Sequence, residues 1–163
     1  MKITKTLTAL SLFPFMLIPC RVNAGAASGD LYVTDFVPAD TGEDVADALQ
    51  ALIDANPNRT IRFPDGEYLV SHPLRTPADP AKSVDLRLSN FAVIRATEGF
   101  SGGAVIALGG KNPYNTTATA GSNYGLTGGV IDGNGIADGV SIDSGRETKI
   151  QDTAIKNTVV GCT

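Results

Sequence analysis

The sequence predicts an all-β fold in which short strands stack as the coils of a solenoid, closed at its first end by one α-helix. From Thr60 onward the chain is a series of brief apolar strands separated by turn residues. Near the end of the sequence, apolar and turn positions repeat with a period in the low twenties. One helical period precedes the strands. Together these three observations favour a stack of coils. Leucine-rich repeats share the period, but their dense leucine and asparagine pattern is missing here.

Residues 1–24 have the pattern of a secretory signal peptide. Met1–Lys5 supplies positive charge, Leu7–Ile18 supplies an apolar run, and Val22–Ala24 fits the small-residue cleavage pattern. The apolar run is too short for a membrane span and contains Pro14. We therefore expect export without stable membrane insertion, and a secreted, periplasmic or cell-surface location in a bacterium.

Residues 25–163 form the expected mature chain, which is long enough for one domain with its own core. Lipid attachment at Cys20 is an alternative to cleavage after Ala24, although Pro19 directly before the cysteine fits it poorly. Cleavage leaves Cys162 without a partner for an internal disulfide. The formal net charge is −4 and no basic run is present, so nucleic acid is not an expected partner.

The helix is expected over about 41–55, after an opening strand at Leu31–Phe36. Asp40 and Glu43 have the spacing of a capping box, and Asn56-Pro57 ends the helical pattern. An amphipathic helix laid over the first coil would shield its apolar interior and its unpaired strand edge. The apolar stripe consists of Val45, Ala48, Leu49, Leu52 and Ile53.

Coils are expected from about residue 60 onward. Turns such as Pro64-Asp65-Gly66 separate the segments, and Lys111–Ser122 is expected to be a protruding loop. The strands predicted before this loop are Ile61–Phe63, Tyr68–Val70, Val84–Leu88, Phe91–Ile94 and Ala104–Leu108.

The repeat is clearest in two segments, Leu126–Gly133 and Ile150–Asn157, which align apolar on apolar at a constant offset. Stacking at about 4.8 Å would place Ile131 on Ile155 and Val130 on Ala154 in an interior column. Gly139 and Gly161 repeat at a slightly shorter offset. Glycines that we expect to adopt positive φ at the corners are Gly128, Gly133, Gly135 and Gly139.

Two stretches resemble a known family. Asp35-Phe36, the following helix and Ile61–Tyr68 resemble the N-terminal entry of right-handed parallel β-helix proteins of the pectin-lyase-like superfamily. Gly129–Gly135 is similar to the "G-x-I-D-G-x-G" stretch of its polygalacturonase-like glycoside hydrolases. The resemblance covers most of Leu31–Cys162 and implies a right-handed, single-stranded parallel β-helix with an N-terminal capping helix.

The same resemblance implies action on acidic polysaccharides, by hydrolases with paired carboxylates or by lyases with Ca²⁺ and a basic residue. The Asn-Thr-Asp, Asp-Asp, Gly-His-Gly and Arg-Ile-Lys motifs of the polygalacturonase-like pattern do not occur in this sequence. We therefore expect no catalytic residue, no cofactor-binding residue and no metal ligand in this chain, and no cofactor.

The resulting hypothesis is the N-terminal part of an exported, polysaccharide-degrading β-helix protein that is inactive as it stands. Its longer form would have a polysaccharide substrate as its partner. Val159–Cys162 begins another coil just before the sequence ends at Thr163, so we expect an open last coil. The chain is then expected to be a monomer or to aggregate through that coil. The alternative is a non-catalytic β-helix adhesin or structural protein at the cell surface.

Three aspartates close in sequence, Asp132, Asp138 and Asp143, suggest an acid pair or a calcium cluster. Turn chemistry explains them better, because aspartate side chains bind turn amides and each of the three lies beside a turn residue. Asp132 is expected to bond the Gly133–Gly135 corner.

His72, the single histidine, is expected at a strand end without a catalytic or metal-binding role. Arg87 and Arg95 alternate with apolar neighbours, so solvent-facing strand positions explain them. Tyr114 and Tyr124 flank the predicted loop, where contact with a sugar and packing at the loop base both remain open.

Overall fold

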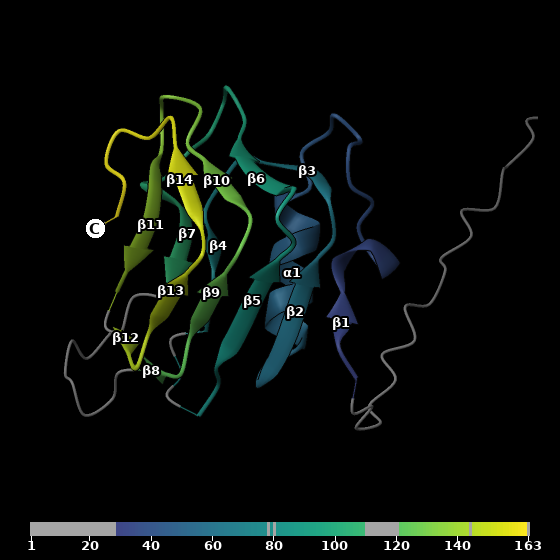
Figure 1. Cartoon of the computed structure of the whole chain (residues 1–163), viewed down its shortest axis with the longest axis vertical. Coiled ribbons are helices and arrows are strands. Elements are labelled where there is room, and N and C mark those ends of the chain that lie inside the picture. The colour runs from purple at the N-terminus through teal and green to yellow at the C-terminus, as the bar shows by residue number, and fades with distance from the viewer. Residues whose placement is uncertain (1–28, 78, 80, 110–120, 144, 163) are drawn as a thin grey trace, which may run out of the picture.

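The computed structural model describes residues 29–77, 79, 81–109, 121–143 and 145–162, and these form a parallel β-helix (Figure 1). The predicted fold is confirmed: the strands are short, every sheet is parallel, and the strands of successive coils stack in register. The predicted signal peptide, Cys20 and Tyr114 lie outside the described residues, as does most of the expected loop at Lys111–Ser122.

Each of the first three coils contributes one strand to each of three main sheets, and the fourth coil contributes a strand to two of them. Before the first coil come β1 (Leu31–Tyr32), the 3₁₀ turn η1 (Val33–Asp35) and α1 (Ala46–Ala55). The first coil holds β2 (Arg59–Phe63), β3 (Gly66–Val70) and β4 (Leu74–Arg75), and the second holds β5 (Val84–Leu88), β6 (Ala92–Ala96), β7 (Ala104–Leu108) and β8 (Gly121–Ser122). The third coil holds β9 (Gly125–Thr127), β10 (Val130–Asp132), β11 (Asp138–Ile142) and β12 (Gly145–Arg146), and the fourth holds β13 (Lys149–Gln151) and β14 (Ala154–Lys156).

We call the stacks sheet A, sheet B and sheet C. Sheet A has the order β1-β2-β5-β9-β13, sheet B the order β3-β6-β10-β14, and sheet C the order β4-β7-β11, while β8 and β12 form a separate pair. Figure 1 shows the coils advancing from the purple N-terminal end to the yellow C-terminal end. Each coil thus rests on the one before it, as in a solenoid.

The predicted repeat is confirmed in sheet B, where Ile131 pairs with Ile155 and Val130 with Ala154. Ile131 points inward and is buried, and Ile155 packs against the same core. The prediction that Val130 and Ala154 face the interior is wrong, since Val130 is half-buried and Ala154 is exposed. Neighbouring residues on a strand point to opposite faces, so Val130 and Ala154 must face out when Ile131 and Ile155 face the core.

Inward-facing side chains form one continuous core along the solenoid. The rings of Phe63 and Tyr68 pack edge to face, with centroids 5.4 Å apart. The Tyr68 hydroxyl donates a hydrogen bond to the Pro64 carbonyl over 3.1 Å, which satisfies the one polar atom of that side chain. Fully buried members from successive coils include Ile61, Leu74, Leu86, Ile94, Ile106, Leu126, Ile131 and Val140.

The corners of the coils use two different devices. Gly128 (φ 78°) and Gly135 (φ 76°) adopt positive φ as predicted. The same prediction is wrong for Gly133 and Gly139, which are required for close packing. A Cβ on Gly133 would overlap the Ala137 carbonyl, and one on Gly139 would overlap Ile155 Cγ2 and the Gly161 carbonyl. Polar residues at positive φ turn other corners, namely Asn58, Asn123, Asn134, Asp152 and Asn157.

The helix begins later than predicted, at Ala46, and its N-cap is Val45, which makes no side-chain capping bond. The predicted capping box of Asp40 and Glu43 is therefore wrong. Asp40 (φ 57°) instead pairs with the edge of β3, because its amide donates to the Glu67 carbonyl (2.9 Å) and its Oδ1 accepts from the Glu67 amide (2.7 Å). A distant strand has replaced the local helix terminus as its partner.

Asp44 completes this edge. Its Oδ1 accepts hydrogen bonds from the amides of Ala46 and Ser71, each over 3.0 Å, so one carboxylate joins the helix start to the end of β3. Burial raises the pKa of Asp44, but the hydrogen bonds from Ser71 and Ala46 outweigh that effect and hold the pKa below its ordinary value.

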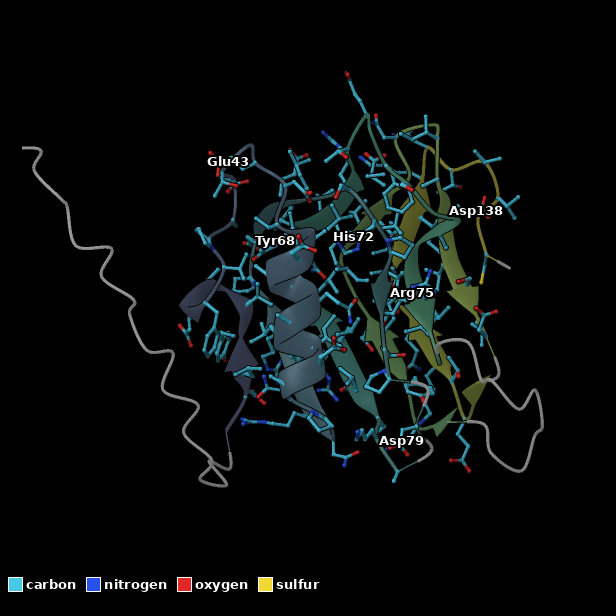
Figure 2. All side chains as sticks on the ribbon, turned by 180° about the vertical axis from the view of Figure 1, so that it is seen from behind. Glu43, Tyr68, His72, Arg75, Asp79 and Asp138 are labelled. Carbon is cyan, nitrogen blue, oxygen red and sulfur yellow. The ribbon has the colours of Figure 1, made fainter. Side chains whose placement is uncertain are left out.

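The helix covers the first coil with a stripe slightly different from the predicted one. Leu49, Leu52 and Ile53 are buried as expected, whereas Ala48 is exposed and Ala46 is buried. Figure 2 shows α1 beside the strands that carry Tyr68 and Arg75. None of the helices in the described part of the chain is long and apolar enough to cross a membrane.

Gln50 on α1 closes the open edge of sheet C. Its Nε2 donates to the Arg75 carbonyl over 3.0 Å, and its Oε1 accepts from the Arg75 amide over 2.8 Å. The side-chain amide thus takes the place that a neighbouring strand would occupy beside β4. Edge strands left with free donors and acceptors invite pairing with other chains, so this bond pair protects the first coil.

Candidate functional site

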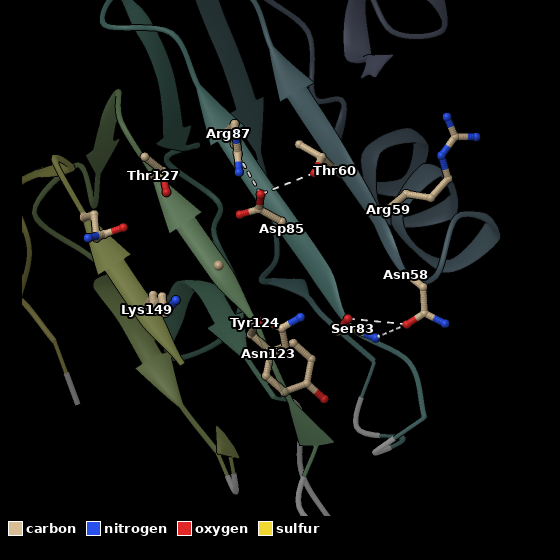
Figure 3. A pocket seen from close by; sticks show the side chains of 12 residues that line it. Asn58, Arg59, Thr60, Ser83, Asp85, Arg87, Asn123, Tyr124, Thr127 and Lys149 are labelled. Atoms are coloured by element: carbon tan, nitrogen blue, oxygen red, sulfur yellow. Dashed lines mark hydrogen bonds and ion pairs between the residues drawn. The ribbon is translucent and has the colours of Figure 1, made fainter. Parts of the chain in front are cut away.

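A polar groove of about 370 Å³ lies on the outer face of sheet A (Figure 3). It crosses the strands β2, β5, β9 and β13, and so draws on all four coils. Its lining consists of Asn58, Arg59, Thr60, Ser83, Asp85, Arg87, Asn123, Tyr124, Gly125, Thr127, Lys149 and Gln151.

In-register stacking arranges the outward-facing strand residues of the lining in two columns. Residues that alternate with the buried core positions point outward, and each column takes one outward residue from every coil. The first column runs Thr60, Asp85, Gly125 and Lys149. The second runs Arg62, Arg87, Thr127 and Gln151, of which the last three line the groove.

Positive charge prevails in the groove. Its lining holds three cations, Arg59, Arg87 and Lys149, and one carboxylate, Asp85, for a formal charge of +2. The whole chain carries a formal net charge of −4. A local potential opposite in sign to that of the molecule favours anionic ligands at this face.

Asp85 is held in one orientation by its neighbours. Its Oδ2 accepts a hydrogen bond from Arg87 Nε over 2.6 Å and another from the Thr60 hydroxyl over 3.3 Å. Figure 3 shows both interactions across β2 and β5. Because Arg87 neutralises it, this carboxylate is suited to accept a hydrogen bond from a ligand rather than to attack one.

The end of the groove near Tyr124 is tied to its surroundings by hydrogen bonds. Tyr124 is buried, and its hydroxyl donates a hydrogen bond to the Pro77 carbonyl. Burial, with the nearby charge of Asp79, raises the pKa of Tyr124. Asn58 Oδ1 accepts from the Ser83 amide over 2.9 Å, which ties the first two coils together. Of the two interpretations open for Tyr124, the packing one describes its ring, although the residue also borders the groove.

The Asp132 prediction is confirmed. Its Oδ1 accepts from the Asn134 amide over 3.0 Å, as a turn aspartate should, and from Asn157 Nδ2 over 3.1 Å. Asp132 Oδ2 lies 3.2 Å from Arg95 Nε and 3.5 Å from Lys156 Nζ. Sequence reasoning missed these two ion pairs, because they join residues of three coils.

An ion-pair row therefore runs along the outside of sheet B. Arg95 bridges Asp132 and Glu67, whose Oε1 lies 2.7 Å from Arg95 Nη1. Arg95 and Glu67 are half-buried and face outward from sheet B. Arg87 on sheet A is exposed, so the prediction that both arginines face solvent is confirmed. Burial raises the pKa of Asp132, but hydrogen bonds from Asn134 and Asn157 and the charge of Arg95 hold it below its ordinary value.

The other candidate residues do not gather at the groove. Asp138 Oδ1 accepts a hydrogen bond from the Val160 amide over 2.9 Å, which links β11 to the chain that follows β14. Asp143 is exposed. His72 lies just after β3 with Nε2 3.0 Å from Asp47 Oδ1 on α1. Among the described residues, no group of three or more His, Cys, Asp or Glu is placed to hold a metal ion.

The groove can hold a ligand rich in hydroxyl and anionic groups. Hydroxyl, amide, guanidinium and ammonium groups line it, so it offers both donors and acceptors. Inverting glycoside hydrolysis requires two carboxyl groups roughly 6.5–9.5 Å apart, and retaining hydrolysis also requires two. The described lining of the groove contains one carboxylate, Asp85, and not the pair that either reaction requires.

The groove was not predicted from the sequence, although buried and outward-facing residues alternate within each strand and the outward-facing ones line it. The columns become visible only when the strands are placed in register. Comparison of the chain with protein-family models, curated proteins and solved structures found no match.

Proposed function

We propose that this chain belongs to an exported β-helix protein that degrades a polysaccharide, with the described coils holding the polymer in the groove of sheet A. The observation that carries the proposal is the positively charged, hydroxyl- and amide-lined groove that crosses all four coils. The resemblance to the polygalacturonase-like branch of the pectin-lyase-like superfamily supports the same substrate class.

A polymer suits the shape of the groove. The outward columns repeat once per coil, at the parallel strand spacing of about 4.8 Å. Equivalent backbone positions therefore recur along the axis of the solenoid, which favours a ligand that itself has repeating units. The cations Arg59, Arg87 and Lys149 favour a polymer that carries carboxylates, as pectic polysaccharides do.

The lining also favours a second candidate function. Because Asp85 is its one carboxylate and is already paired with Arg87, the groove matches a protein that holds a glycan without cleaving it. A non-catalytic adhesin or structural β-helix protein at the cell surface would use the groove in this way.

Binding and product release test the proposal. The purified chain without residues 1–24 is titrated by calorimetry with oligogalacturonides and with an uncharged galactan of similar length. We expect binding to the acidic ligand that weakens as salt is added, since screening reduces attraction between exposed charges. We expect neither reducing-sugar release nor unsaturated-product absorbance above a buffer control.

The outcomes separate the alternatives. Binding to neither polymer overturns a polysaccharide role for the groove, and product release overturns the holding role of the described coils. If the ligand is bound but not cleaved, the coding sequence on either side of this chain distinguishes a degrading protein from an adhesin. Coils with paired carboxylates would support degradation, and a surface anchor without them would support adhesion.

A further inference from the structure

Gly125 interrupts the first column of the groove. Thr60, Asp85 and Lys149 all present polar side chains at this register position, whereas the third coil presents none. The backbone does not require a glycine here, because Gly125 is not among the residues at positive φ. The requirement comes from the space above it.

That space is occupied by a carboxylate from the previous coil. A Cβ on Gly125 would overlap Asp85 Oδ1 and would lie 3.1 Å from Asp85 Cγ. Asp85 Oδ1 therefore projects over β9, into the gap that the missing side chain leaves. Oδ2 is the oxygen bound by Arg87 and Thr60, so those two bonds fix the direction in which Oδ1 points.

We propose that Gly125 makes room for Asp85 to hold its Oδ1 over β9, and that this oxygen is the acceptor that selects a hydroxyl of one sugar unit in the groove. Arg87 offsets the charge of Asp85, and Lys149, exposed in the next coil, supplies a cation for an anionic group on the same or the following unit. The inference rests on the proposed function, since it assigns specificity within the same groove.

Two variants test this role of Asp85. Gly125→Ala places a methyl group where the carboxylate lies, and the displaced atoms belong to the end of a side chain, so the strand itself can stay in place. Asp85→Ala removes the acceptor and leaves the space open. Gly99→Ala is the matched control, because a Cβ there meets nothing within 4 Å and Gly99 lies outside the groove lining.

The experiment measures calorimetric binding of oligogalacturonides by the wild-type chain and the three variants, with thermal denaturation of each as a check on folding. We expect Gly125→Ala and Asp85→Ala to bind about tenfold more weakly or worse, as loss of a hydrogen bond to a charged group implies. Gly99→Ala should bind as the wild type does, and melting temperatures should be little changed.

The results separate this inference from the function on which it depends. If the wild-type chain binds the ligand and Asp85→Ala binds equally well, the inferred role of Asp85 is wrong and the proposed function stands. Equal binding by a folded Gly125→Ala variant also overturns it. If the wild-type chain binds no oligogalacturonide, both proposals fail. Should Gly125→Ala unfold, Asp85→Ala alone decides.

Discussion

Replacing Asp132 should show how strongly the outside of sheet B holds the coils together. Asp132 lies in the third coil and its partner Arg95 in the second, while Lys156 ends β14 in the fourth coil and Asn157 follows it. The Asp132 side chain is 3% exposed, whereas Arg95 and Lys156 are 36% and 50% exposed. One buried carboxylate thus joins three coils.

The magnitude follows from these contacts. A hydrogen bond to a charged group contributes about 1.5–3 kcal/mol, and Asp132 accepts two from Asn134 and Asn157. Each ion pair adds roughly 0–1 kcal/mol, because its cation is more than a third exposed. Since these contributions overlap, we expect Asp132→Ala to lower the free energy of unfolding by about 3 kcal/mol. That corresponds to a fall of about 10 °C in melting temperature for a domain of this size.

The effect should depend on pH. The pKa of Asp132 is lowered in the folded chain, so its stabilising contribution is present above the unfolded value of about 3.9 and is lost as pH falls through the lower folded value. We expect the stability difference between the wild-type chain and Asp132→Asn to be constant from pH 7 to about pH 5 and to shrink below about pH 4.

Urea denaturation followed by far-ultraviolet circular dichroism measures the free energy of unfolding, and repeating it across this pH range measures how that free energy depends on pH. Asp152→Asn is the control, because Asp152 is an exposed aspartate at a corner of the fourth coil where asparagine also tolerates positive φ. The reasoning is refuted if Asp132→Ala unfolds within 0.5 kcal/mol of the control, roughly the range of an ordinary surface substitution.

Two further substitutions probe the cap and the packing of the last coils. Gln50→Ala removes both bonds to the Arg75 backbone and should lower the free energy of unfolding by about 1 kcal/mol in urea. Gln50→Glu should not restore it, because its carboxylate would face the Arg75 carbonyl and the Asp54 carboxylate. Unchanged stability of Gln50→Ala would show that water replaces the amide at no cost. Gly139→Ala forces a methyl group against Ile155 and the Gly161 carbonyl and should cost about 1–3 kcal/mol by thermal denaturation, whereas Gly99→Ala should cost little. Equal melting temperatures for these two variants would contradict the close-packing role of Gly139.

The fold was predictable because the spacing between its last two coils is constant. Leu126 pairs with Ile150 and Ile131 with Ile155, so both pairs are separated by the same length of chain. Ile94 also pairs with Ile131, although a longer stretch of sequence lies between them. A repeat search that relies on constant spacing therefore finds the last two coils and misses the step from the second coil to the third.

Sequence patterns predicted a residue's role correctly where its hydrogen-bond partner lies close to it in the sequence. Asp132 bonds an amide two residues away, so its turn role could be read from the sequence. Asp40 and Glu43 matched a helix-capping pattern, but the partner of Asp40 is Glu67, which only the folded chain brings close. The groove was hidden for the same reason, because its columns take each residue from a different coil, at unequal separations along the chain.

The coils differ in length, yet their strands pair in register, and this decides where the chain can tolerate insertions and deletions. Extra residues can enter the connections while the cross-section of the core remains the same, because pairing is decided strand by strand. A one-residue change inside a strand would instead turn every later side chain of that strand inside out. Foreign peptides grafted into a connection should therefore be tolerated better than deletions within β5 or β6.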